Sequence, residues 1–448
     1  MTAPEGTSRR TVLTAACAAV TATTAAADPR PAPRAAAPAR PVAHHGWTSC
    51  ADWARGTARG TRVVDAAHPH LAIDAPTGVT ERTDPRTGRS TTWEHAVWTG
   101  PEQVLAVAAS EVIPSWNAHT PPGTWLRVEL RGTYADGSRT PWYLMGDWAA
   151  GDRDVTRTSK DGQGDGRSAV RTDTLAVTDP GTRLVACRAR LTLYRTPGSR
   201  RSPLVRRLGL TVSDLPDRST VAPAPPAHPG VHRELRVPRY AQTVHAGRYP
   251  EYDNGGEAWC SPASSQMVLE YWGRRPTARD LAWVDPAYDD PQVCHAARAT
   301  YDHAYGGCGN WSFNAAYAAS YRQMTAVVTR LTSLGELEGL IAAGIPVITS
   351  LSFRAEELTG AGYGTPGHLM VVVGFTAGGE VIAHDPSSPS NAEVRRVYRR
   401  REWENIWLRT RRYGSTGKEL DGAGGAAYLF VPAGDGQRRR ALAALGIR

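Results

Sequence analysis

The alternation of apolar and polar residues in the first half of the chain predicts β-strands. Residues Leu126 to Tyr134 alternate in this way, and Leu184 to Tyr194 repeat the pattern. Successive side chains of a strand point to opposite faces, so a period of two is typical of half-buried strands. Gly, Pro and Asp residues separate such runs, and Asp136-Gly137 supplies a turn. We therefore predict an all-β, sandwich-like accessory domain over residues 47–215.

The second half of the chain, residues 231–434, predicts a mixture of helices and strands. Pro262 is a favoured first-turn residue, and Gly273 ends the helix that it begins. Ser333 to Glu336 form a capping box that opens a second helix. Apolar, β-branched runs then predict strands, at residues 345–353, 368–375, 381–385 and 428–431. A helix followed by antiparallel strands is an α+β order.

Three other segments have less regular patterns. Dense prolines in residues 216–230 resist both helix and sheet, which predicts a semi-rigid linker between the two regions. Residues 435–448 are expected to be a loosely attached tail. Loops such as 274–330 and 354–367 are expected to carry the substrate specificity of any site in the second region.

The N-terminus has the pattern of an export signal. Arg9-Arg10 precede a weakly apolar Ala/Thr-rich run that ends in small residues at Ala27. We predict a twin-arginine signal peptide over residues 1–27, a disordered spacer over residues 28–46, and a secreted protein; the alternative is a disordered Ala-rich tail. No apolar run elsewhere is long enough for a transmembrane segment.

The formal net charge of +9 favours a negatively charged partner. Nearly all of the excess is arginine, because Lys160 and Lys418 are the only lysines, and this skew is typical of a high-GC genome. Arginines cluster at residues 395–401 and 438–440, but no zinc-finger or RNA-binding motif accompanies them, so no nucleic-acid partner is expected. Residues 160–166 lack the ligands of a calcium loop, and we expect no metal or cofactor.

Tryptophan is concentrated in the first region, which holds eight of the fourteen in the chain. Such side chains fill the core of a small sandwich, or they stack on sugars when exposed. The core interpretation is favoured, and binding to a cell-wall polymer is the alternative.

Cysteine usage draws attention to Cys260. The sequence has six cysteines, of which Cys17 lies in the predicted signal, and an odd number of five remains for an exported protein. We predict the disulfides Cys50–Cys187 and Cys294–Cys308, which leave Cys260 as the free thiol. His295 and His303 lie near the second pair, but the spacing fits no common zinc pattern. Because Cys260 opens a predicted helix, where a thiolate is favoured over a thiol, it is a candidate nucleophile.

Candidate helpers for Cys260 occur in the same region. His368 begins a predicted strand after a glycine-rich stretch, and Asp385 ends the next strand of the same hairpin, so pairing brings a base and its orienting carboxylate together. The amide of Gln242, with the backbone N–H of Cys260, can donate hydrogen bonds to an oxyanion. His245 and His384 are interpreted as structural.

These residues stand in four short motifs: Val237-Pro-Arg-Tyr-Ala-Gln242, Cys260-Ser-Pro-Ala-Ser-Ser-Gln-Met-Val-Leu-Glu-Tyr-Trp-Gly273, Gly367-His-Leu-Met-Val-Val-Val-Gly-Phe375 and His384-Asp-Pro386. The set resembles the papain-like cysteine peptidases of the bacteriocin-processing (double-glycine leader) type, and more narrowly their stand-alone secreted relatives. The resemblance covers about residues 235–390. It implies a papain-like α+β fold in which a helix carries the cysteine and an antiparallel sheet carries the histidine.

The resemblance also implies roles for four residues: Cys260 as nucleophile, His368 as base, Asp385 as orienting group and Gln242 in the oxyanion hole. The sequence departs from the family at Ser261, where glycine is usual. It also has neither the membrane segment nor the phosphate loop of leader-processing transporters, so processing during export is not implied.

We therefore hypothesise a secreted, monomeric papain-like cysteine peptidase that hydrolyses peptide or amide bonds of a peptide or protein substrate through a Cys-His-Asp triad and an acyl-enzyme. Amidase or acyl-transfer chemistry uses the same residues and stays open. The second hypothesis is an inactive papain-like scaffold whose β domain binds cell wall or polysaccharide. The sequence does not decide whether residues 47–230 bind a ligand or inhibit the site.

Overall fold

The computed structural model describes residues 40–414 and 416–447 of the chain. The predicted signal over residues 1–27 and most of the predicted spacer over residues 28–46 lie outside these residues. The end of that spacer differs from the prediction, because Val42–Trp47 form strand β1, which pairs antiparallel with β14 (Leu204–Ser213). Val42 and Trp47 at the two ends of β1 are buried, and their burial gives this segment a reason to be ordered.

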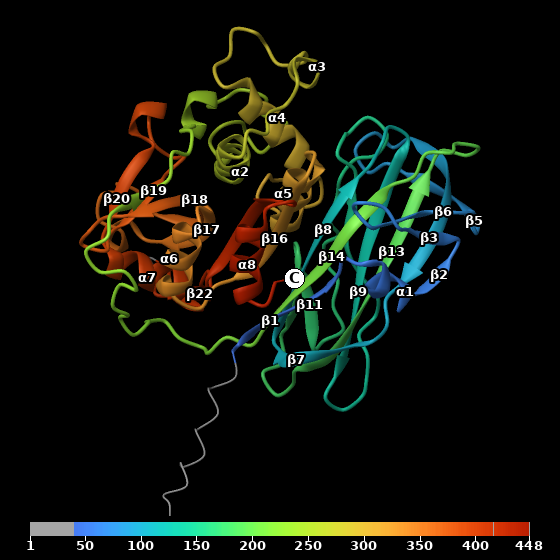
Figure 1. Ribbon diagram of the computed structural model, residues 1–448, viewed down its shortest axis with the longest axis horizontal. Helices are drawn as coiled ribbons and strands as arrows, with labels where there is room; N and C mark the ends of the chain where they lie inside the picture. The colour runs from blue at the N-terminus through green and yellow to red at the C-terminus, as the bar shows by residue number, and fades with distance from the viewer. Residues whose placement is uncertain (1–39, 415, 448) are drawn as a thin grey trace, which may run out of the picture. The chain divides into compact units, whose positions relative to one another are not determined.

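The N-terminal domain is all-β and consists of two antiparallel sheets (Figure 1). One sheet has the strand order β11-β12-β8-β14-β4-β3, with β1 beside β14; the other has the order β10-β9-β13-β6-β2, with β5 beside β6 and β7 beside β13. The further strands are β2 (Thr57–Arg59), β3 (Thr61–Val64), β4 (His70–Ile73), β5 (Gly78–Thr83), β6 (Ser90–Thr99), β7 (Gln103–Ala109), β8 (Glu111–His119), β9 (Thr124–Tyr134), β10 (Tyr143–Trp148), β11 (Ser168–Arg171), β12 (Thr174–Val177) and β13 (Leu184–Arg195). The all-β prediction for this region is confirmed.

The core of this domain explains its tryptophans. The alternation predicted along β9 is present, since Leu126, Val128 and Leu130 are fully buried. Seven of the eight tryptophans are at most 4 % exposed. The eighth, Trp142, is half-buried beneath the guanidinium of Arg190. The tryptophans therefore fill the core, and they do not form an exposed platform for sugars.

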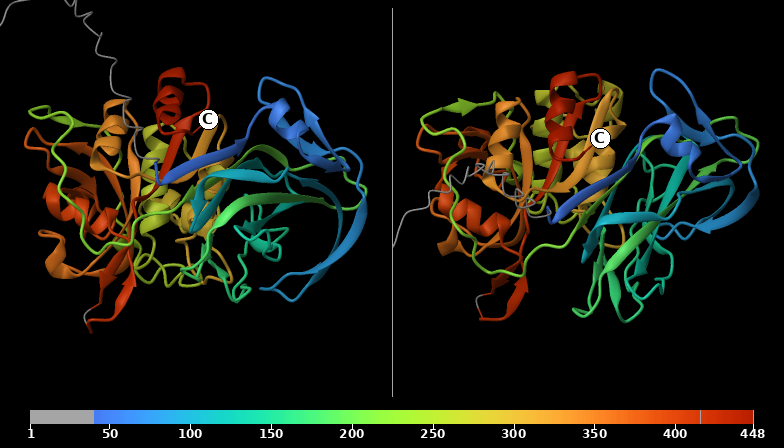
Figure 2. Two further views of the ribbon diagram at one scale, coloured as in Figure 1. Left: turned by 90° about the horizontal axis from the view of Figure 1, so that it is seen from below. Right: turned by 60° about the horizontal axis from the view of Figure 1, so that its bottom comes forward.

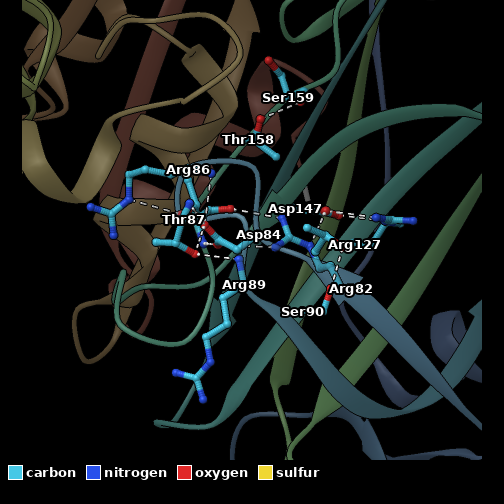
Figure 3. A network of polar contacts seen from close by, with 12 residues as sticks. Arg82, Asp84, Arg86, Thr87, Arg89, Ser90, Arg127, Asp147, Thr158 and Ser159 are labelled. Carbon is cyan, nitrogen blue, oxygen red and sulfur yellow. Dashed lines mark hydrogen bonds and ion pairs between the residues drawn. The ribbon is translucent and has the colours of Figure 1, made fainter.

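A polar network fixes the edge of the β domain that faces the second region (Figure 3). The buried carboxylate of Asp147 on β10 accepts hydrogen bonds from Arg127 at 2.7 Å and 3.0 Å and from Arg82 at 3.2 Å. Asp84 accepts from the backbone N–H of Thr156 at 2.8 Å. Because charge-assisted bonds of this kind are strong, the network holds the segment around Thr156 in place.

The C-terminal domain is mixed, as predicted, and is built on one antiparallel sheet. The strand order is β16-β23-β17-β18-β19-β20, with β15 beside β18. The strands are β15 (Arg233–Glu234), β16 (Met324–Arg330), β17 (Val347–Phe353), β18 (Thr365–Phe375), β19 (Val381–His384), β20 (Arg395–Tyr398) and β23 (Ala426–Pro432), with a separate hairpin of β21 (Arg411–Tyr413) and β22 (Glu419–Asp421). The helices are α2 (Cys260–Tyr271), α3 (Ala278–Leu281), α4 (Pro291–Thr300), α5 (Trp311–Ser320), α6 (Leu334–Ala342), α7 (Arg400–Leu408) and α8 (Gly436–Ala444); α1 (Cys50–Ala54) belongs to the β domain.

Two predicted helix starts have different caps. The hydroxyl of Ser333 accepts from the N–H of Glu336, as a capping box requires. The carboxylate of Glu336 accepts from the N–H of Thr332 instead of Ser333, so the box is only half formed. Helix α2 begins at Cys260, and its N-cap residue, Trp259, makes no side-chain hydrogen bond to the helix.

Residues 274–330, expected to be loops, instead contain three helices and a strand. Thr277 caps α3 with a complete capping box, and Asn310 caps α5 through its side chain. Helix α5 is buried on all sides from Ser312 to Ala319, so its sequence has no amphipathic period to reveal it.

The linker and the tail are both attached to the C-terminal domain. Residues 216–230 contain no helix or strand in the described structure, but the N–H of Val221 donates to Asn405 at 3.0 Å. Residues 436–444, part of the expected loose tail, form α8, the red helix beside the C mark in Figure 2. Leu442 and Ile447 are buried, which attaches this segment to the body of the protein. No helix in the described part of the chain is long and apolar enough to cross a bilayer.

Helix α5 is shared by the two domains. Its residues Phe313 and Ala316 belong to the core of the β domain, where the ring of Phe313 meets that of Trp116 edge-on at 6.0 Å. The side chain of Asn117 on β8 donates to the carbonyl of Ala326 at 2.8 Å and accepts from its N–H at 3.2 Å. The β domain is thus joined to the sheet of the C-terminal domain by both apolar and polar contacts.

The β11–β12 hairpin reaches from the β domain to the N-terminus of α5. Asp173 at its tip accepts from the N–H of Trp311, the first residue of α5. The side chain is 5 % exposed. Burial raises the pKa of Asp173 to about 6, and the nearby negative charge of Asp302 adds to the effect, while the hydrogen bond from Trp311 opposes it.

This carboxyl group should make stability depend on pH. A carboxyl whose pKa is higher in the folded protein than in the unfolded chain binds more protons when folded, so the free energy of unfolding falls as pH rises from about 4 to about 6. The shift corresponds to about 3 kcal/mol. Asp173→Asn keeps an acceptor for Trp311 and should remove this part of the dependence. Urea unfolding of both proteins between pH 4 and pH 7 measures it, and parallel stability curves would contradict it.

Candidate active site

Cys260 lies at the N-terminus of α2, where the chain geometry leaves donors free. The first helical bond runs from the N–H of Ala263 to the carbonyl of Trp259, at 3.0 Å. The N–H groups of Cys260 and Ser261 precede it, and such groups have no acceptor within their helix. Trp259 is fully buried and its indole N–H donates to the carbonyl of Tyr252, which fixes the entry to the helix. The side chain of Cys260 is 9 % exposed.

His368 and Asp385 meet as the strand pattern predicts. In the register of β18 and β19, Val371 lies opposite His384, which places Asp385 just beyond the pair and near His368. The Nε2 atom of His368 lies 2.9 Å from Oδ1 of Asp385. Both side chains are almost completely buried. Because Nε2 is engaged by the carboxylate, Nδ1 is the ring nitrogen left for the hydrogen bond to Cys260.

The charges of this group favour a protonated imidazole. Burial by itself lowers the pKa of His368, but the negative charge of the Cys260 thiolate and the hydrogen bond to Asp385 outweigh it and raise the pKa to about 10. Burial by itself raises the pKa of Asp385, but the hydrogen bond and charge of His368 hold it below its ordinary value. The imidazolium is therefore the favoured form at neutral pH.

Asp385 has three further donors, none of which the sequence suggested. The hydroxyl of Tyr363 donates to its oxygens at 3.0 Å and 2.9 Å, the hydroxyl of Tyr398 at 2.8 Å, and the N–H of Ser387 at 2.9 Å. Burial and the charge of Asp385 raise the pKa of both tyrosines, which keeps them protonated as donors. An aromatic residue isolated in a glycine-rich stretch was a possible signal for Tyr363; Tyr398 on β20 had none.

Gln242 is held beside the segment that leads to Cys260. It opens the short 3₁₀ helix Gln242–His245, and its N–H donates to the carbonyl of Pro386 at 2.8 Å. Its Nε2 donates to the carbonyl of Glu257 at 2.7 Å, which occupies one of its two amide hydrogens. A Cβ on Gly256 would lie 2.1 Å from the carbonyl oxygen of Gln242, so only glycine permits this close approach. Within the described residues, the second amide hydrogen of Gln242 makes no hydrogen bond.

Ser261, which replaces the usual glycine, is accommodated inside the protein. Its side chain is fully buried, and its hydroxyl lies 3.0 Å from that of Tyr428 on β23. The hydroxyl group that serine adds, compared with glycine, therefore has a polar partner inside the protein. Sequence alone gave no indication of Tyr428 as this partner.

The two predicted disulfides are not formed, and this prediction was wrong. All five cysteines of the described residues are free thiols. Cys294 and Cys308 have separate partners: the first lies 3.5 Å from Nδ1 of His245, and the second donates to the carbonyl of Ala297 at 3.5 Å. Cys187 and Cys50 also have separate surroundings. Cys187 is fully buried on β13, whereas Cys50, the first residue of α1, contacts Asp65. The odd number of cysteines therefore gives no reason to single out Cys260. Its position at the start of α2 and beside His368 does. Cys17 lies outside the described residues.

The remaining histidines near the site have structural surroundings. His384 lies 3.1 Å from the carbonyl of Pro238, and His245 contacts Cys294. Burial lowers the pKa of each to about 4, so both are neutral near pH 7. Within the described residues, no group of three or more His, Cys, Asp or Glu side chains is arranged to hold a metal ion.

Family models match both domains of the described structure. The family model described as "Peptidase C39 N-terminal domain" matches residues 43–213, and that of the "Peptidase C39 like family" matches residues 234–415. The crystal structure of a C39-like peptidase candidate from Bacillus anthracis is 19 % identical over 45 % of this chain and 98 % of that chain, with a TM-score of 0.29. No curated protein matches the chain. Through the two family models, which cover both of its domains, the chain belongs to the C39 family of papain-like peptidases.

Proposed function

We propose that this protein is a cysteine peptidase that hydrolyses peptide bonds through an acyl-enzyme on Cys260. The observation that carries the proposal is the 2.9 Å contact between Nε2 of His368 and Asp385, which leaves Nδ1 for the cysteine at the start of α2. A nucleophile, its base and an orienting carboxylate then follow one another in hydrogen-bond contact.

In the first half of the reaction, the thiolate of Cys260 attacks the carbonyl carbon of the scissile bond. The tetrahedral oxyanion accepts hydrogen bonds from the N–H of Cys260 and the free amide hydrogen of Gln242. The imidazolium of His368 then gives its Nδ1 proton to the leaving nitrogen as the C–N bond breaks, which leaves a thioester and a neutral imidazole.

In the second half, His368 takes a proton from water, and the resulting hydroxide attacks the thioester. The acid product leaves, the C–S bond breaks, and the thiolate–imidazolium pair is restored. Asp385 keeps the ring in the orientation and tautomer that both halves need, and its own three further donors keep it ionised. The same thioester would pass its acyl group to an amine if water were excluded, so transfer chemistry differs only in the second acceptor.

Removal of the nucleophile provides the first test. Cys260→Ala should abolish cleavage of unfolded polypeptides, while Cys50→Ala, which changes a thiol outside the site, should leave it unchanged. Cleavage is measured by labelling new amino termini and identifying them by mass spectrometry. Equal cleavage by the wild type and by Cys260→Ala would refute the assigned nucleophile.

The ion pair should also be visible without a substrate. His368 is protonated below a pKa of about 10, so its positive charge faces Cys260 throughout the range from pH 6 to pH 9. Iodoacetamide should alkylate Cys260 faster in the wild type than in His368→Ala at each pH in that range, because the neighbouring positive charge favours the thiolate that reacts.

Peptide mapping by mass spectrometry gives the rate for each cysteine. Burial raises the pKa of Cys187 and Cys294 to about 12, so these two serve as unreactive internal controls. Equal alkylation rates of Cys260 in the wild type and in His368→Ala would contradict the ion pair.

A further inference from the structure

A cleft of about 790 Å³ lies at the junction of the two domains, apart from the residues of the catalytic group. The β domain contributes β14 to its wall, and the C-terminal domain contributes the start of β16, the end of β23 and helix α8. None of the four candidate catalytic residues, Gln242, Cys260, His368 and Asp385, is among its lining residues.

The lining of the cleft is strongly basic. Five arginines and one histidine line it, from four separate parts of the chain, and no acidic side chain is among its lining residues in the described structure: Arg206, Arg207, Arg322, Arg439, Arg440 and His68. Arg322, Arg439 and Arg440 are exposed to solvent. Charges of one sign that converge in a concave site raise the local concentration of a ligand of the opposite sign.

The position of the arginines on α8 adds to this potential. Arg438, Arg439 and Arg440 occupy the first turns of the helix, where the helix dipole is positive and basic side chains are unfavourable. Asp435 caps the helix and pairs with Arg438 at 2.7 Å, but Arg439 and Arg440 face the cleft. This arrangement costs stability, and it increases the attraction of the cleft for an anion.

Two further features favour a polypeptide over a simple anion. Apolar side chains lie between the arginines, among them Met324, Leu442 and Ile447. In addition, β16 is the edge strand of its sheet, and the β domain covers only its later part, through bonds to the backbone of Ala326 and Val328. Alternate residues of a strand direct their backbone groups to the same side, so the carbonyl of Met324 points toward the cleft.

We propose that this cleft binds an acidic segment of a polypeptide in extended form. Its carboxylates would pair with the guanidinium groups, which match carboxylate geometry with two parallel bonds, and its backbone would lie along the open start of β16. The site does not depend on cleavage at Cys260, because none of the catalytic residues lines it.

The test measures binding in the full-length Cys260→Ala protein, so that its outcome is separate from that of the peptidase proposal. The probe is a fluorescein-labelled decaglutamate peptide followed by fluorescence anisotropy, with decalysine as the opposite charge. Arg439→Glu with Arg440→Glu should weaken decaglutamate binding by about tenfold or more, since two charge pairs are lost. Arg322→Glu, on a different element, should weaken it as well.

The matched control changes the same charge elsewhere. Arg89→Glu with Arg200→Glu alters the net charge by the same amount at two exposed turns of the β domain, and should change the affinity less than twofold. Acidic residues in the first turns of α8 suit the helix dipole, so the Arg439/Arg440 variant should keep its melting temperature. An equal loss in both double variants, no saturable binding, or inorganic polyphosphate that binds while decaglutamate fails to compete with it would overturn the proposal.

Discussion

The buried carboxylate of Asp385 is the constraint on which the geometry of the candidate site depends. Transfer of a charged group out of water costs several kcal/mol unless donors replace the water. Four donors do so, and they come from different segments of the chain: His368, Tyr363, Ser387 and Tyr398. The pairing of β18, β19 and β20 therefore also sets the orientation of the imidazole. The carbonyl of the next residue, Pro386, accepts from the N–H of Gln242, so the same loop also positions Gln242.

The β domain is packed into the body of the protein and is not a loosely attached module. Phe313 and Ala316 of α5 complete its core, and Asp173 binds the N-terminus of that helix. Helix α5 in turn contacts the helix that carries Cys260, since Ser265 donates to Asn314 at 3.0 Å. Separation of the domains would expose apolar surface of α5 and remove a charge from its first N–H. These contacts give the Trp-rich sandwich a structural role beside the C39-like domain.

Local patterns carried most of what the sequence could predict. The alternation of apolar and polar residues predicted β9 and β13, and Pro262 and Gly273 predicted the two ends of α2. The predicted hairpin placed His368 beside Asp385. What the sequence missed depends on tertiary contacts: Tyr398 reaches the carboxylate of Asp385 only because β20 pairs with β19, and α5 is buried on all sides and has no apolar stripe. The disulfides failed for another reason, because they were derived from cysteine number and an assumed compartment, whereas bond formation requires the two sulfur atoms to meet.

The ionisation of His368 tests the central claim most directly. In protein labelled with ¹⁵N-histidine, the imidazole signal of His368, assigned by its loss in His368→Gln, can be followed between pH 5 and pH 11. The account predicts that the ring stays protonated through neutral pH and titrates near a pKa of about 10, and that the pKa falls in Cys260→Ala, which removes the charge of the thiolate. An imidazole that titrates at its ordinary value near 6.5 in both proteins would contradict the thiolate–imidazolium pair.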